Sequence, residues 1–163
     1  LCKIASKRYK SFEEYNYNPS YEIRHSDEKD ESFDRQGTYC DGKLTLIHGD
    51  SAIELKKLLE TIDQPCCFWL DAHSGAQQYA RGNQDVPLLT ELDIIKNHQI
   101  KDHIIAIDDA HLFGKIQYDK DGNISCDYSN VTFDLVKEKL LEINPNYDVG
   151  LYAPYQMEMI IAV

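Results

Sequence analysis

The sequence predicts an α/β fold of the doubly wound type, in which a mostly parallel sheet lies between two layers of helices and ends in a C-terminal antiparallel hairpin. Short apolar runs of strand length alternate with amphipathic segments from Lys43 onward. Two runs, CCFWLDAH at 66–73 and IIAIDDAH at 104–111, begin apolar throughout, which is typical of strands covered on both faces. The last two strand candidates are separated only by PYQ, which indicates a hairpin.

The elements follow one another in a regular order. Strands are predicted at 44–50 (LTLIHGD), 66–72 (CCFWLDA), 103–109 (HIIAIDD), 147–153 (YDVGLYA) and 157–163 (MEMIIAV). Helices are predicted at 51–62, 86–98 and 131–143, where apolar residues recur at helical spacing. Ser51 is the candidate cap of the first helix, and Pro87 suits the first turn of the second.

The segment 119–130 (DKDGNISCDYSN) lies between the 103–109 strand and the last helix. Its Asp121-Gly122 pair is typical of a tight hairpin turn, so we expect a protruding insertion here. The segment also resembles a calcium-binding EF-hand loop in its first oxygen-bearing positions. Ile124 and Asn130 replace the glycine and the glutamate that such a loop requires, which favours the hairpin.

Length and composition limit the function. The 163 residues, 42% of them hydrophobic, are enough for one domain, which we expect over 1–163 with an irregular part at 1–43 and a regular α/β part at 44–163. The net charge of −11 disfavours nucleic-acid partners. The sequence shows no membrane-spanning apolar stretch and no disulfide-framework spacing among its five cysteines, so we expect a cytoplasmic protein without membrane contact.

Acidic residues end two of the predicted strands. Asp71 follows one apolar run, and Asp108 with Asp109 follows the next. Neighbouring parallel strands end at the same edge of a sheet about 5 Å apart, so these carboxylates are expected to converge. Carboxylates this close must share a proton, meet a basic group or hold a cation. Mg²⁺ suits oxygen ligands alone, whereas His73 or His111 would favour Mn²⁺, Fe²⁺ or Zn²⁺; the alternative is that these residues only cap loops.

The order LTLIHGD, FWLDAH, HIIAIDDAHLF, a helix and a terminal hairpin resembles the later two-thirds of class I S-adenosylmethionine-dependent methyltransferases, which have a Rossmann-like fold. The similarity covers about Lys43 to Val163 and is greatest to O-methyltransferases that act on small molecules. The resemblance implies that Asp50, with Ser51 after it, lies by the adenine of the cofactor. It also implies that Asp71 lies near both the methyl donor and the acceptor.

In the metal-dependent members of that family, the resemblance implies a site for Mg²⁺ or another divalent cation at Asp71, Asp108 and Asp109. Such a cation would hold an acceptor hydroxyl of a small molecule or sugar, lower its pKa and direct it at the methyl group. His73 or His111 is the candidate general base. Asp71, His73 and His111 are thus the expected catalytic residues.

This chain differs from the family pattern in its first part. The family's first strand and glycine-rich loop have no counterpart here, because no glycine precedes Gly37. We therefore expect residues upstream of Leu1, or another segment, to supply a central strand, since unpaired backbone groups are costly to bury. Two other functions stay open: a metal-dependent hydrolase such as a phosphoesterase, and a non-catalytic binding domain that has lost methyltransferase activity.

Overall fold

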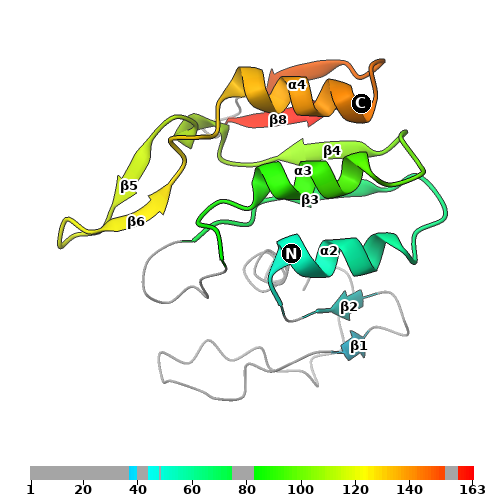
Figure 1. Ribbon diagram of the computed structural model, residues 1–163, viewed down its shortest axis with the longest axis horizontal. Helices are drawn as coiled ribbons and strands as arrows, with labels where there is room; N and C mark the ends of the chain where they lie inside the picture. The colour runs from blue at the N-terminus through cyan, green and yellow to red at the C-terminus, as the bar shows by residue number, and fades with distance from the viewer. Residues whose placement is uncertain (1–36, 40–43, 48, 75–82, 153–157) are drawn as a thin grey trace, which may run out of the picture. The chain divides into compact units, whose positions relative to one another are not determined.

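The computed structural model describes residues 37–39, 44–47, 49–74, 83–152 and 158–163. The chain, drawn in Figure 1, divides into two compact units, Leu1–Gly49 and Asp50–Val163. Most of the predicted irregular part at 1–43 (residues 1–36 and 40–43) and most of the loop that follows His73 lie outside the described residues. In the described part, no helix is both long and apolar enough to cross a membrane.

The first unit contains a short hairpin. Strand β1 (Gly37–Tyr39) pairs antiparallel with β2 (Leu44–Leu46), and Thr38 lies opposite Thr45. The predicted strand at 44–50 therefore exists over three residues, but its expected place in a parallel sheet is wrong: its pairing partner is β1. A strand of three residues forms most readily with a neighbour a few residues away in sequence, because that pairing closes only a short loop.

The second unit contains a mixed sheet of four strands in the order β3-β4-β8-β7. Its strands are β3 (Cys67–Leu70), β4 (Ile104–Ile107), β8 (Met159–Ala162) and β7 (Val149–Tyr152). Only β3 and β4 pair in parallel; β8 is antiparallel to both β4 and β7. The predicted C-terminal hairpin is confirmed, and the described sheet is mixed with one parallel pair, because the antiparallel strand β8 lies between β4 and β7.

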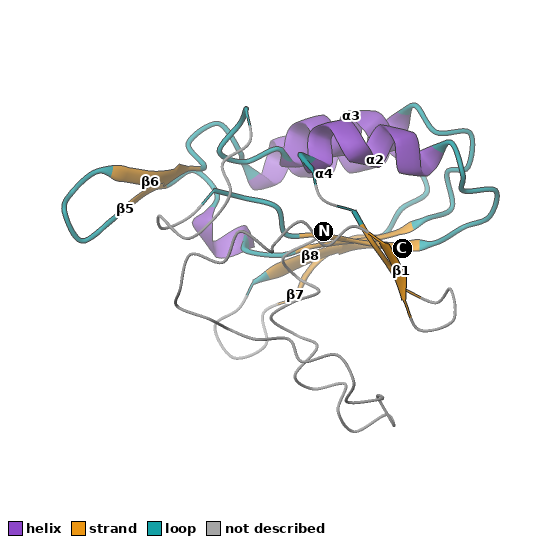
Figure 2. Cartoon of the chain, turned by 90° about the horizontal axis from the view of Figure 1, so that it is seen from below, coloured by secondary structure: helices purple, strands orange, loops and turns teal. Residues whose placement is uncertain are grey.

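Helices α2 (Ser51–Leu59), α3 (Leu88–Lys96) and α4 (Phe133–Ile143) cover the same face of this sheet, as Figure 2 shows. The α/β class is confirmed, whereas the described residues contain no second helical layer. The core lies between the helices and the sheet. It includes Leu55, Leu59, Phe68, Leu70, Leu88, Leu92, Ile95, Ile105, Ile107, Val136, Leu140, Ile143, Ile160 and Ala162.

Side-chain caps begin two of the helices. Asp50, not the predicted Ser51, is the N-cap of α2, and its carboxylate accepts the backbone N–H of Ala52 at 2.9 Å. Thr132 caps α4 by accepting the N–H of Leu135 at 3.2 Å. The prediction for α2 is one residue late because a serine and an aspartate in succession are both good caps.

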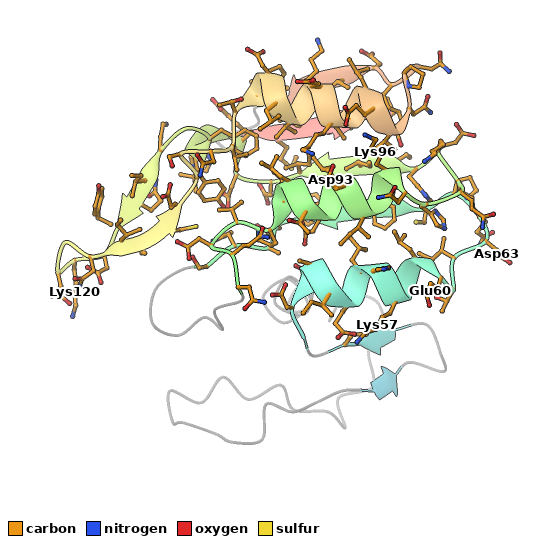
Figure 3. All side chains as sticks on the ribbon, in the orientation of Figure 1. Lys57, Glu60, Asp63, Asp93, Lys96 and Lys120 are labelled. Atoms are coloured by element: carbon orange, nitrogen blue, oxygen red, sulfur yellow. The ribbon has the colours of Figure 1, made fainter. Side chains whose placement is uncertain are left out.

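Ion pairs join α3 to α4 on their outer surface. Asp93 of α3 pairs with Lys139 of α4 at 2.6 Å, and Lys96 of α3 pairs with Glu142 of α4 at 2.9 Å. Asp93 and Lys96 are labelled in Figure 3. Exposed pairs of this kind contribute little to stability. The buried apolar residues therefore hold the two helices together.

The predicted insertion after β4 is confirmed as a second hairpin. It consists of β5 (Ile116–Tyr118) and β6 (Ile124–Asp127), and it projects away from the four-stranded sheet (Figures 1 and 2). Gly122 in its turn has a φ of 83°, which glycine adopts without strain. The Asp119 carboxylate accepts the N–H groups of Asp121 and Asn123, which fixes the turn.

Two histidines close the end of the β3–β4 pair that lies opposite the acidic strand ends. His103, which is 1% exposed, accepts the N–H of Cys66 at Nδ1 over 3.2 Å. Its Nε2–H then faces Nδ1 of His98 at 3.0 Å, and Nε2 of His98 lies 3.2 Å from the carbonyl of Ile62. This chain of contacts is complete when both imidazoles are neutral with the proton on Nε2. A further proton on either ring would place two donors face to face.

Protonation of His103 should therefore weaken the fold. Burial, followed by the neighbouring His98, lowers the pKa of His103 below its ordinary value. A pKa that is lowered on folding gives stability that is complete above about pH 6.5 and is lost as the pH falls below that value. We expect wild type to exceed His103→Gln by about 1 kcal/mol in free energy of unfolding at pH 7.5, and by much less at pH 5.

Urea unfolding at the two pH values measures this difference. His111→Asn is the matched control because His111 is a partly exposed histidine in the same unit. Its difference from wild type should change much less between pH 7.5 and pH 5. An advantage of wild type over His103→Gln that is the same at both pH values would contradict the prediction.

Candidate metal centre

The parallel pairing of β3 with β4 brings the two acidic strand ends to one edge of the sheet. Leu70 pairs with Ile107 in the register of the two strands, and the N–H of Asp108 donates to the carbonyl of Leu70 at 3.0 Å. Asp71 therefore follows β3 at the point where Asp108 and Asp109 follow β4. The predicted convergence of the strand ends is confirmed.

Three side chains form a group with the donor atoms of a metal site. Asp71, His73 and Asp109 each offer one donor atom, and these atoms lie within 4.8 Å of one another. All three residues are half-buried. A first-row divalent ion holds its donors at about 2.0–2.2 Å, so two donors of one ion lie at most about 4.4 Å apart. A small adjustment of the side chains would bring the group within that limit.

Asp109 has an unusual backbone conformation. Its φ is 60°, the left-handed region, which aspartate tolerates better than most residues but at some cost. Two hydrogen bonds hold this turn: Asp109 N–H donates to the Asp108 carboxylate at 2.9 Å, and Ala110 N–H donates to the Glu158 carbonyl at 2.9 Å. The turn is thereby attached to the segment that leads into β8.

His73 is oriented by its neighbours. Its Nδ1–H donates to the carbonyl of Ser74 at 2.5 Å, which leaves Nε2 facing Oδ2 of Asp109 at 3.3 Å. Ser74 is itself buried. Its N–H donates to the carbonyl of Asp85, and its hydroxyl donates to the carbonyl of Ser125. A histidine ligand held at one ring nitrogen by a backbone carbonyl presents the other nitrogen to a metal.

The two groups also perturb each other's protonation. The hydrogen bond to Asp109 raises the pKa of His73, against an opposing effect of burial. The same hydrogen bond lowers the pKa of the Asp109 carboxyl. Without a cation, the pair is therefore favoured as imidazolium and carboxylate. A divalent ion would replace the proton on Nε2.

The remaining predicted site residues lie in other positions. Asp108 is buried and binds the backbone of Asp109, so it supports the group without belonging to it. His111 lies on the short 3₁₀ turn η3 (Ala110–Leu112), with Nδ1 3.9 Å from Oδ1 of Asp109. The carboxylate of Asp50, besides capping α2, accepts the N–H of Asn83 at 3.3 Å. Ser51 forms a hydrogen bond with Glu91.

Two residues that the sequence pattern did not single out, Glu91 and Tyr128, lie beside the group. They line a small pocket together with Asp71, Asp108 and Asp109. The signal for Glu91 was present: Leu88, Leu92 and Ile95 mark the apolar face of α3, and Glu91 falls on that same face. Tyr128 follows β6 and is buried, and burial raises the pKa of its phenol.

Searches of this chain against protein-family models, curated proteins and solved structures found no match. The chemistry of the site is therefore argued from its donors. Two carboxylates and one imidazole suit Mn²⁺, Fe²⁺ or Zn²⁺ better than Mg²⁺, which prefers oxygen ligands alone.

Replacing Asp109 should change the titration of His73. In Asp109→Asn, the carboxylate that raises the pKa of His73 is gone, so this pKa should fall. Asparagine also tolerates the left-handed backbone, which separates the charge from strain. NMR titration of the histidine Cε1 protons measures the effect.

The free energy of unfolding should also depend on pH through His73. A pKa raised on folding gives stability that is complete below about pH 6.5 and is lost as the pH rises through the folded-state pKa. Asp71→Asn is the control, since Asp71 is the weakest of the influences on His73, and it should lower that pKa less. An unchanged His73 pKa in Asp109→Asn would show that the two side chains do not interact.

Proposed function

We propose that the protein is an S-adenosylmethionine-dependent methyltransferase that uses a divalent cation to transfer a methyl group to a hydroxyl of a small molecule or sugar. One observation carries the proposal: Asp71, His73 and Asp109 come together at the carboxyl ends of two adjacent parallel strands. Ligands of open α/β sheets bind at this edge.

The order of the elements also supports the proposal. The resemblance to class I methyltransferases rests on an order of elements that this chain has: α2, β3, α3, β4, α4 and the hairpin β7–β8. The β5–β6 insertion lies beside the site edge, since the Ser74 hydroxyl donates to the carbonyl of Ser125 in β6. An insertion there is placed to shape an acceptor site.

The residues of the site would have separate roles in the proposed methyl transfer. The cation would act as a Lewis acid on the acceptor hydroxyl, and S-adenosylmethionine would supply the methyl group. Asp71, His73 and Asp109 would hold the cation, so His73 acts as a ligand and not as a base. His111, near the same carboxylate but outside the group, is then the candidate general base. Asp50 and Ser51 remain the proposed cofactor contacts.

Calorimetric titration tests both ligands. We expect S-adenosylmethionine to bind, and Mn²⁺ to bind with an affinity that Asp71→Asn lowers about tenfold or more, because a charged ligand is lost. Asp63→Asn is the matched control, since Asp63 lies in the loop after α2 and outside the group. Mn²⁺ affinity should also be higher at pH 8 than at pH 6, because a proton on His73 competes with the ion.

The outcomes separate the three functions. Binding of S-adenosylmethionine supports the methyltransferase. Binding of Mn²⁺ alone, with hydrolysis of p-nitrophenyl phosphate, would replace this proposal with a phosphoesterase. No binding of either ligand would leave a non-catalytic domain.

A further inference from the structure

The pocket beside the metal group contains a buried acid that the proposed chemistry does not use. Glu91 enters it from α3, is 2% exposed, and has an Oε2 atom without a hydrogen-bond partner. Ser51 provides a hydrogen bond to the same carboxyl. A buried acid with one oxygen unpaired destabilises the folded state, and an apolar residue at this position of α3 would be more favourable for folding.

The charged residues that line the pocket with Glu91 are all acidic. Asp71, Asp108 and Asp109 line the same pocket, and none of its described lining residues is a lysine, an arginine or a histidine. Burial, with smaller effects of Asp50 and Asp71, raises the pKa of Glu91. Each of these costs would be relieved by a positive group placed in the pocket.

The size of the pocket limits what that group is. Its free space is about that of one water molecule, and apolar side chains form much of its wall, among them Leu70, Val86, Leu88 and Ile107. A primary ammonium is of this size and carries the donors that Oε2 lacks. A guanidinium would be too large for this space.

The pocket and the metal group share two residues, Asp71 and Asp109. A ligand with one group on the cation and another in the pocket therefore needs these groups only a few atoms apart. A hydroxyl and an amine on neighbouring carbons meet this requirement.

We propose that the pocket binds the ammonium group of the methyl acceptor, so that the acceptor is an amino sugar or another amino alcohol whose hydroxyl lies next to its amine. The role of the ligand as acceptor rests on the proposed function. The ammonium site itself rests on Glu91 and its pocket.

The smallest matched probes are 2-aminoethanol and ethane-1,2-diol, which differ in one ammonium against one hydroxyl. NMR titration of the protein with Zn²⁺ present gives the affinity for each. We expect wild type to bind 2-aminoethanol about tenfold or more tightly than the diol, as a hydrogen bond to a charged group allows. In Glu91→Gln, which keeps the shape and removes the charge, this preference should fall about tenfold.

Glu138→Gln is the control, because Glu138 is exposed on α4. It should keep the preference of wild type. The thermal midpoint of Glu91→Gln should equal or exceed that of wild type, since an uncompensated buried acid is removed; a purely structural Glu91 would give a lower midpoint. Equal affinity of wild type for the two probes, or no binding of 2-aminoethanol, would overturn the inference.

The comparison of the two probes is independent of the titration with S-adenosylmethionine. If the proposed function fails, S-adenosylmethionine does not bind while the preference for the amine is retained. If the ammonium site fails, S-adenosylmethionine binds and the two probes do not differ.

Discussion

The parallel pairing of β3 with β4 is the interaction on which the site depends. The hydrogen bond from Asp108 N–H to the Leu70 carbonyl lies at the end of the pairing, next to the last register pair of Leu70 with Ile107. A shift of one residue in this register would turn Asp71 or Asp109 to the other face. The apolar contacts between the helices and the sheet maintain the register, so the positions of the site residues depend on the packing of the core.

The carboxylate of Asp109 at this edge can be balanced by a proton on His73 or by a bound cation. A proton on His73 lets Asp109 remain ionised, as the pKa directions of the pair indicate. A divalent ion would serve the same purpose with three donors in place of one hydrogen bond. A bound metal would therefore compete with the proton for the same imidazole nitrogen, and its affinity would depend on pH.

The sequence predicted well what depends on pattern and poorly what depends on backbone detail. The alternation of apolar runs was enough to place α2, α3, α4, β3 and β4, and Asp121-Gly122 was enough for the second hairpin. The partner of β2 was missed because the sequence pattern did not indicate a strand at 37–39. His73, rather than Asp108, joins Asp71 and Asp109 in the three-residue group because the Ser74 carbonyl orients the His73 ring, while the Asp108 carboxylate binds the N–H of Asp109; a strand pattern reveals neither contact.

The two ends of the β3–β4 pair show how a buried polar group that serves the fold differs from one that points to a ligand. At the histidine end, the contacts run without interruption from Cys66 through His103 and His98 to Ile62, and each ring nitrogen has a partner. At the acidic end, Glu91 is buried about as deeply as His103 but leaves one oxygen unpaired in a pocket that Asp71, Asp108 and Asp109 also line. Folding alone favours the first arrangement and opposes the second. The unpaired oxygen is therefore better explained by a ligand than by the fold.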